Sequence, residues 1–239
     1  MTRPPCTQGC RRRTTSAPPR TRCPSRRSLR SVPRRHRSVG AVARLLLVRH
    51  GQSTWNAEHR WQGHSDPPLS DLGERQARLA ATAVVALDIH ALFSSDLQRA
   101  RQTAALLAPP DLDAEVVPAV KERTVGEWEG LTRTEIEERY PGMLGSPVRP
   151  PGFESDEALI TRVRPALESL AERVGDRAAL VVTHGGVIRS LERLFESTPD
   201  VLPNLGGRWF VVIGDTLELG EPEVLIDPHD VALTAPREE

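Results

Sequence analysis

Two short stretches, LLLVRHG at residues 45–51 and LVVTHGG at residues 180–186, give the clearest indication of the fold. Each begins with branched apolar residues and ends in His-Gly, a pattern typical of a buried strand of a parallel sheet followed by a turn. The carboxyl ends of parallel strands meet at one edge of the sheet, where such folds bind ligands. We therefore expect His50 and His184 to lie in one crevice. Arg49 adds a planar cation suited to phosphate oxygens, and the glycines let the backbone approach a ligand closely.

The rest of the chain alternates between strand and helix patterns, which predicts an α/β domain. Helix starts are marked by Ser70, by the capping box of Thr132 with Glu135, and by Ser155. The expected strands cover residues 44–48, 91–93, 115–117 and 179–183, and the expected helices cover residues 70–87, 97–107, 132–140, 155–174 and 187–195. Past residue 207 the pattern changes to three short strands, at 208–213, 216–219 and 224–226, joined by tight turns at 214–215 and 220–222.

The first forty residues differ from the rest in composition. Residues 1–40 hold 12 arginines and no Asp, Glu or Lys, which leaves 20 basic residues and all 32 acidic residues for residues 41–239. The balanced net charge therefore combines a strongly basic tail with an acidic domain. Because the tail is rich in Pro, Ser and Arg and poor in apolar runs, it cannot bury enough surface to offset the entropy of ordering, and we expect it to be disordered.

Three explanations of this tail stay open. Clustered arginines suit an arm that binds nucleic acid, although no aromatic side chain is interleaved with them for stacking. An organelle transit peptide has a similar composition, although the tail lacks an amphipathic helical period. We favour the third explanation, in which native translation starts near Val42 or Ala43. The expected organisation is a tail over residues 1–40, a folded domain over 41–227 and a loose, polar C-terminus over 228–239.

Cysteine usage bears on metal sites and compartment. Cys6, Cys10 and Cys23 all fall inside the tail, so the domain is expected to hold no disulfide, as in proteins of the reducing cytoplasm. These cysteines and His36 lack the spacing of a usual zinc site, and we predict no metal. No apolar stretch approaches the ~20 residues that span a bilayer, and no signal-peptide pattern follows the basic start. We expect a cytoplasmic protein with no membrane partner.

Six segments of the domain carry a resemblance to a known family. They are LVRHGQSTWN (residues 47–56), WQG (61–63), LSDLG (69–73), SSDLQRA (94–100), ERTVGEWEG (122–130) and VTHGG (182–186). In this order they are similar to the motifs of the histidine phosphatase superfamily, also called the phosphoglycerate mutase-like family, and the match spans residues 43–213. The resemblance implies a three-layer α/β/α sandwich around a mostly parallel sheet, with phosphoglycerate mutase-like topology. It also implies phosphoryl transfer through a phosphohistidine, with no cofactor.

His50 is the expected nucleophile. A neutral imidazole has a lone pair available near pH 7, whereas Arg and Lys have none. Arg49, Arg99 and His184 are expected to hold the three nonbridging phosphate oxygens. By composition Arg101 has an equal claim to this role, and only the resemblance selects Arg99.

Glu122 is the expected proton donor to the leaving oxygen and, later, the base for water. Glu127 and Glu129 lie close by, and the resemblance points to the glutamate that precedes the Gly-x-Trp-x-Gly segment. Further contributions to phosphate binding are expected from Ser53, Asn56, Gln62 and Gly185, the last because the helix after His184 directs its first amides toward the strand end.

Two activities in this family differ in the fate of the phosphoryl group: water takes it in a phosphatase, and another hydroxyl takes it in a mutase. Bisphosphoglycerate-dependent mutases have a Tyr-Gly-x-Leu-x-Gly segment and a longer insertion with a lysine and paired arginines. This chain has VGEWEG at residues 125–130, Lys121 as its single lysine, and a short proline-rich loop. We therefore predict a metal-independent phosphomonoesterase, with the mutase as the alternative. A non-catalytic binder of phosphorylated ligands would be expected to lack one of the reacting residues.

The expected partner is a small phosphorylated metabolite, not nucleic acid, and its identity stays open. Relatives acting on α-ribazole phosphate, glucosylated phosphoglycerate or sugar phosphates share these motifs, and Phe153 stands where relatives often have glycine. Trp55, Trp61 and Trp128 either form a flat wall for a leaving group or pack under the loops. The C-terminal hairpins could pair two subunits, so a homodimer stays open.

Overall fold

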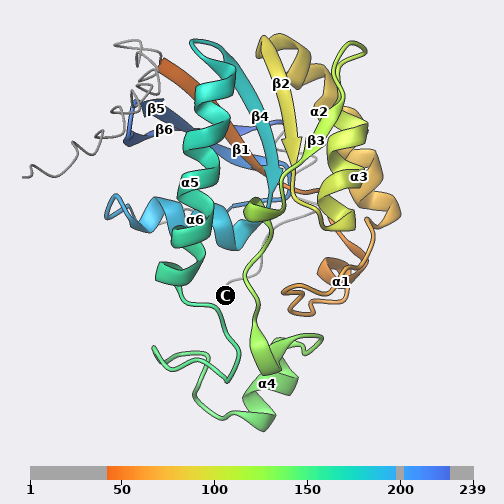
Figure 1. Cartoon of the computed structure of the whole chain (residues 1–239). Helices are drawn as coiled ribbons and strands as arrows, with labels where there is room; N and C mark the ends of the chain where they lie inside the picture. The colour runs from red at the N-terminus through yellow and green to blue at the C-terminus, as the bar shows by residue number, and fades with distance from the viewer. Residues whose placement is uncertain (1–41, 198–201, 227–239) are drawn as a thin grey trace, which may run out of the picture. The chain divides into compact units, whose positions relative to one another are not determined.

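The structure is a computed structural model that describes residues 42–197 and 202–226. Its centre is a six-stranded sheet of order β3-β2-β4-β1-β5-β6 (Figure 1). The strands are β1 (Val42–Arg49), β2 (Ile89–Ser94), β3 (Ala114–Val116), β4 (Ala178–Thr183), β5 (Gly206–Ile213) and β6 (Thr216–Val224). Strands β3, β2, β4 and β1 pair in parallel, and β5 and β6 are antiparallel additions. The expected mostly parallel sheet is confirmed.

Helices cover both faces of the sheet, as Figure 1 shows. Alternate residues of β1 face opposite cores: Leu45 and Leu47 pack with the helices α5 and α6, and Leu46 and Val48 pack with α2 and α3. All four side chains are fully buried, which explains why the strand is a continuous apolar run. The helices are α1 (Thr54–Ala57), α2 (Asp71–Ala86), α3 (Gln98–Leu107), α4 (Arg133–Arg139), α5 (Asp156–Val174) and α6 (Gly185–Arg193), with 3-10 turns η1 (Pro118–Val120) and η2 (Gly126–Trp128).

The capping signals in the sequence mark the real helix starts. The hydroxyls of Ser70, Thr132 and Ser155 accept backbone N–H groups of α2, α4 and α5, and Glu135 completes the capping box of α4. Helix α6 was expected at 187–195; it begins two residues earlier, directly after His184, and ends at Arg193.

The prediction of two separate strands at 216–219 and 224–226 is wrong. Residues 220–222 do not turn; they lie inside β6, which pairs with β5 over its length and shifts register between Arg208 and Phe210. Strand β6 is the edge strand of the sheet and has a neighbouring strand on one side only. Proline lacks a backbone N–H and is tolerated in such an edge strand, which explains Pro222. The Gly-Glu-Pro segment therefore forms an irregular stretch of one strand.

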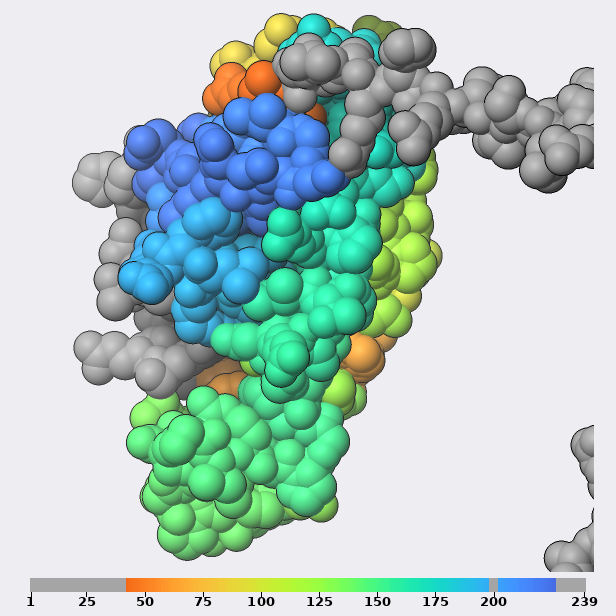
Figure 2. All heavy atoms as spheres, turned by 60° about the vertical axis from the view of Figure 1, so that its left-hand side comes forward, coloured from red at the N-terminus to blue at the C-terminus, as the bar shows by residue number. Residues whose placement is uncertain are grey.

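Residues 124–153, here called the cap segment, lie beyond the carboxyl ends of the parallel strands and contain α4 (Figure 1). The cap segment has a small core of its own, made of Val125, Trp128, Leu131 and Ile136. In Figure 2 it forms the green lobe at the bottom of the view. It thus places a second wall opposite the sheet edge where the histidines lie.

Two sets of predictions lie outside the described residues. These are the disordered tail over 1–40, with its cysteines and His36, and the loose terminus over 228–239. None of the helices that the structure describes is both long enough and apolar enough to cross a membrane.

Candidate active site

The two His-Gly stretches meet at one edge of the sheet, as the sequence predicts. Strands β1 and β4 are parallel neighbours with Arg49 opposite Thr183, and the backbone N–H of His50 donates to the carbonyl of Thr183 at 3.0 Å. The rings of His50 and His184 lie edge to face with centroids 5.2 Å apart. A cavity of about 1280 Å³, lined by His50, opens from this point toward the cap segment.

The His50 ring is held in one orientation and one tautomer. Its Nδ1 lies 2.6 Å from the carbonyl oxygen of Gly51, which can only accept, so Nδ1 carries the proton and Nε2 keeps its lone pair. The Gly51 amide is fixed by Thr103, and the His50 carbonyl accepts from Asn204 at 2.9 Å. Burial, followed by the positive charges of Arg99 and Arg49, holds the pKa of His50 well below its ordinary value. The imidazole is therefore neutral at pH 7.

His184 lies fully buried beside His50. Its Nε2 is 2.8 Å from the hydroxyl of Ser95, which also accepts the backbone N–H of Leu97. Its Nδ1 has no hydrogen-bond partner within the described part of the chain. Burial and the nearby charge of Arg99 lower the pKa of His184 well below the ordinary value, so this ring is neutral as well.

The structure separates the two candidate arginines of α3. Arg99 is 1% exposed, and its terminal nitrogens donate to the carbonyls of Ser65 at 2.7 Å and Gly63 at 3.0 Å. Its buried Nε makes no hydrogen bond within the described residues, and burial lowers its pKa to about 10. Arg101 is exposed and does not line the cavity. Arg99, but not Arg101, therefore lies with the histidines.

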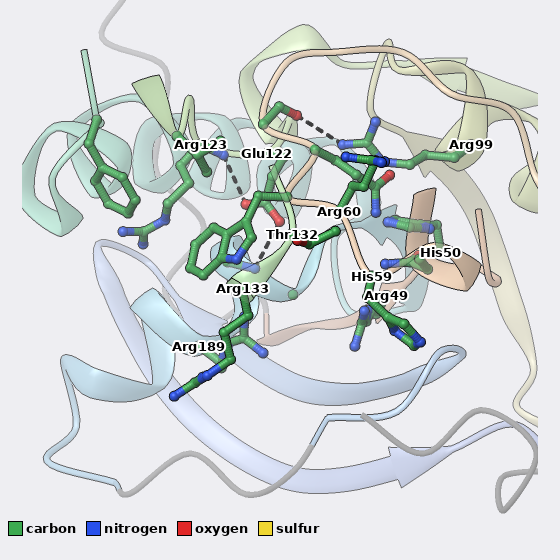
Figure 3. Close-up of a pocket in the computed structure, with 18 of the residues that line it drawn as sticks. Arg49, His50, His59, Arg60, Arg99, Glu122, Arg123, Thr132, Arg133 and Arg189 are labelled. Atoms are coloured by element: carbon green, nitrogen blue, oxygen red, sulfur yellow. Dashed lines mark hydrogen bonds between the residues drawn. The ribbon is translucent and has the colours of Figure 1, made fainter. Parts of the chain in front are cut away.

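Glu122 lines the same cavity, and Figure 3 draws it to the left of Arg99, His50 and Arg49. Its two carboxylate oxygens accept the backbone N–H groups of Arg123 at 2.8 Å and Gly186 at 3.0 Å. A Cβ at position 186 would overlap this carboxylate, so a larger residue there would displace it. The amide of Gly186, expected to face phosphate, holds the glutamate instead.

The four further residues expected to bind phosphate occupy different positions. Asn56, Gln62 and Gly185 line the cavity. Ser53 is fully buried, and its hydroxyl caps α1 and donates to Gln62 at 2.8 Å, so it supports the wall from behind. Of the other two glutamates considered for proton transfer, Glu127 accepts the hydroxyl of Tyr140 and Glu129 accepts that of Ser65.

Several residues at the site were not singled out in the sequence. Arg123, 9% exposed, lines the cavity and bonds to Asp156 and Ser190. Asn204 reaches the site from a loop far along the chain. The position of Arg123 directly after Glu122 was a usable signal, whereas nothing in the sequence near Asn204 distinguishes it from an ordinary loop asparagine.

The cavity as a whole is strongly basic. Among the described residues, eight arginines line the cavity, against three acidic side chains, Glu58, Glu122 and Asp156. The arginines are Arg49, Arg60, Arg99, Arg123, Arg133, Arg149, Arg189 and Arg193. Arg60 pairs with Glu58 and Glu135, and Arg123 and Arg193 both pair with Asp156. Figure 3 shows Arg133 and Arg189 below Glu122 in the view. An anionic ligand larger than phosphate fits this charge distribution.

The tryptophans divide between the two interpretations left open by the sequence. Trp61 lines the cavity and packs edge to face on Trp128 at 5.1 Å. Trp128 is 1% exposed and belongs to the core of the cap segment. Trp55 lies under Gly130. One of the three thus contributes to the wall, and the others pack beneath it.

The metal-ligating residue types are not gathered at this site. Within residues 42–197 and 202–226, no three His, Cys, Asp or Glu side chains are placed to hold a metal ion together. The groups beside His50 include instead the imidazole of His184 and the guanidinium of Arg99.

A comparison of the sequence with known protein families gives a match over most of the domain. The profile of the histidine phosphatase superfamily (branch 1) matches residues 45–205, which include His50, Arg99, Glu122 and His184. The chain belongs to this superfamily. The family recognised from the sequence motifs is thereby confirmed.

Individual relatives that are named phosphatases cover most of the chain. The chain is 33% identical over 208 residues to a glucosyl-3-phosphoglycerate phosphatase of Mycolicibacterium vanbaalenii, covering 78% of this chain and 91% of that protein. It is 38% identical over 160 residues to a metal-independent phosphoserine phosphatase of Arabidopsis thaliana, covering 63% and 67%. A phosphoglycerate mutase structure from Bacillus anthracis superposes with a TM-score of 0.69 at 23% identity, covering 81% and 97%, which confirms the fold. The protein is a phosphatase of this superfamily.

Proposed function

We propose that the protein is a metal-independent phosphomonoesterase that acts through a phosphohistidine on His50. The observation that carries the proposal is the state of the His50 ring: buried, neutral, with Nδ1 bound to Gly51 and the Nε2 lone pair available. An imidazole held in this way attacks phosphorus without first losing a proton. The attack forms an N–P bond on Nε2 and breaks the ester P–O bond.

Three cationic or N–H donors are proposed to bind the nonbridging oxygens. The Nε of Arg99 and the Nδ1 of His184 are buried beside His50 and have no partner within the described residues, so a phosphate oxygen would satisfy each. In our assignment the Ser95 hydroxyl donates to Nε2 of His184, which leaves the ring proton on Nδ1. Arg49, at the end of β1, supplies the third donor. These groups stabilise the charge that develops in the transition state.

Glu122 is proposed to move the proton in both half-reactions. It protonates the leaving oxygen as the P–O bond breaks, then takes a proton from water as that water attacks the phosphohistidine. The second step breaks the N–P bond and releases inorganic phosphate. The two amides that hold the Glu122 carboxylate keep it at the cavity wall in both steps.

The proposed substrate is a small metabolite whose leaving group carries a further anionic group. The support is the excess of arginine over acid in the cavity lining, to which α6 and the cap segment each contribute two arginines. The relatives named above act on glucosyl-3-phosphoglycerate and phosphoserine, both small phosphorylated metabolites. We include a cytoplasmic location in the proposal, and the test below also covers the phosphoglycerate mutase reaction, the alternative that the sequence leaves open.

The test is hydrolysis of p-nitrophenyl phosphate and a panel of carboxylated phosphomonoesters by the full-length protein in EDTA. His50→Ala is compared with His90→Ala, which removes an exposed histidine outside the cavity. Loss of phosphate release in His50→Ala alone, with an acid-labile phosphoprotein trapped in the wild type, supports the proposal. Phosphate release by His50→Ala at the wild-type rate would overturn it. Conversion of 3-phosphoglycerate to 2-phosphoglycerate with added bisphosphoglycerate, without hydrolysis, would select the mutase.

A further inference from the structure

Arg162, on α5, lies outside the cavity and yet bonds to the backbone that carries Glu122. One terminal nitrogen donates to the carbonyls of Ala119 at 2.7 Å and Lys121 at 2.9 Å. The other donates to the carbonyl of Glu122 at 3.0 Å. A single side chain thus holds three carbonyls of the four-residue stretch that ends at the proposed proton donor.

Glu154 fixes the same guanidinium from the other side. Its two carboxylate oxygens accept from Nε and from the second terminal nitrogen of Arg162, each at 2.8 Å. A guanidinium has five N–H groups, and these five acceptors use all of them. Glu154 is itself tied to the same region, because its backbone N–H donates to the carbonyl of Thr124 at 2.9 Å. Although burial opposes it, the bonds to Arg162 hold the pKa of Glu154 below its ordinary value, so the pair is ionised at neutral pH.

We infer that Arg162 is a positioning residue for proton transfer by Glu122, and that Glu154 holds Arg162 in place. The inference rests on the proposed function. The amides of Arg123 and Gly186 fix the Glu122 carboxylate, but they do so only while the Glu122 backbone keeps its position beside the start of α6. Arg162 holds the backbone in that position, since its bonds join α5 to the segment that ends at Glu122. Lysine cannot replace it, because an ammonium has three donors and no planar fork.

The test uses leaving groups that differ in their need for a proton. An alkoxide leaves only when protonated, whereas p-nitrophenolate leaves without general acid help. The parameter is kcat/KM, which covers the steps up to phosphoryl transfer and excludes the later attack of water. Glu122→Ala, which removes the proton donor, is expected to lower kcat/KM at least 100-fold for an alkyl phosphate and less than tenfold for p-nitrophenyl phosphate.

Arg162→Gln and Arg162→Lys are expected to show the same split, with a loss of at least tenfold for the alkyl phosphate and about threefold or less for p-nitrophenyl phosphate. Glu154→Gln is expected to lose less than either but in the same pattern. In the Arg162→Gln, Glu122→Ala double variant, the alkyl phosphate should lose no more than in Glu122→Ala alone. Arg164→Gln, an exposed arginine two residues further along α5, is the matched control, and its two kcat/KM values should stay within twofold of wild type.

Equal losses for both substrates in the Arg162 variants would overturn the inference, as would additive losses in the double variant. If the Arg162 variants fail to fold, the same comparison with Glu154→Gln decides, because it keeps the arginine. A wild type that hydrolyses neither substrate would contradict the proposed function. A split in Glu122→Ala without one at Arg162 or Glu154 would contradict the positioning role alone.

Discussion

The two walls of the cavity are built on different principles. The sheet wall carries His50, His184 and Arg99, each no more than 3% exposed and each at the end of a strand or the start of a helix packed on the core. The cap wall carries Arg133 and Arg149, which are exposed and stand on a segment whose own core is four side chains. Rigid, buried groups suit phosphoryl transfer, which is the same reaction for every substrate. Exposed groups on a small separate core suit recognition of a leaving group, which differs from one substrate to the next. We therefore assign the chemistry to the sheet wall and substrate selection to the cap wall.

Arg99→Lys, on the sheet wall, is expected to have the largest effect on activity. The substitution removes two bonds to the carbonyls of Ser65 and Gly63 and the Nε donor that faces the phosphate in our proposal. Loss of one preorganised donor to the transition state typically lowers kcat by about 10²–10³-fold. We expect that loss in kcat/KM for p-nitrophenyl phosphate, which has no distal anion for the cap wall to recognise.

Arg101→Lys is the matched control for this substitution, because Arg101 is exposed on the same helix. It should leave kcat/KM within twofold of wild type. Thermal unfolding of both variants separates a lost donor from a lost fold. Similar activity losses in the two variants would show that Arg99 has no special place on the sheet wall.

The sheet wall should also govern the dependence of stability on mild acid. Burial keeps the pKa values of His50 and His184 well below the ordinary value of about 6.5, so the unfolded chain binds protons that the folded chain does not. The stability due to these neutral histidines is complete above pH 6.5 and falls as pH decreases from 6.5 toward the lowered pKa values. Each histidine should cost up to about 1.4 kcal/mol of unfolding free energy between pH 7.5 and pH 5.5.

Urea unfolding of the wild type and of a His50→Asn, His184→Asn variant at these two pH values measures the effect. The variant should lose less stability than the wild type over the same interval. Equal losses would mean that the two rings bind protons in the folded state as readily as in the unfolded one.

The sequence predicts the sheet wall better than the cap wall for a physical reason. Apolar runs such as residues 45–48 specify buried strands, and the topology of a parallel sheet then brings His50 and His184 together although 134 positions separate them in the chain. Local capping chemistry likewise specifies the starts of α2, α4 and α5. Both signals can be found in the sequence alone, because a helix cap depends on neighbouring residues and the meeting of strand ends is common to parallel sheets.

The features that escaped prediction depend on particular long-range contacts. The bond from Asn204 to the His50 carbonyl and the use of Gly186 to hold Glu122 require the loops in their final positions. The tight turn expected at 220–222 was wrong for a related reason, since Gly-Glu-Pro signals a turn locally but the edge position of β6 allows it within a strand. Sequence patterns therefore predicted which side chains gather at the cavity and not the network that holds them.

Arg133→Gln, on the cap wall, is expected to have the smallest effect on activity. Arg133 is exposed at the first position of α4 and lines the cavity, so its interaction with a distal anion is screened by solvent and contributes about 1 kcal/mol or less. We expect KM for a carboxylated phosphomonoester to rise up to about fivefold with kcat within twofold, and KM for p-nitrophenyl phosphate to change less. Arg139→Gln, in the last turn of the same helix and outside the cavity, controls for the loss of charge from the cap segment. If the main effect of Arg133→Gln were on kcat, the cap wall would take part in the chemistry, and the division between the two walls would fail.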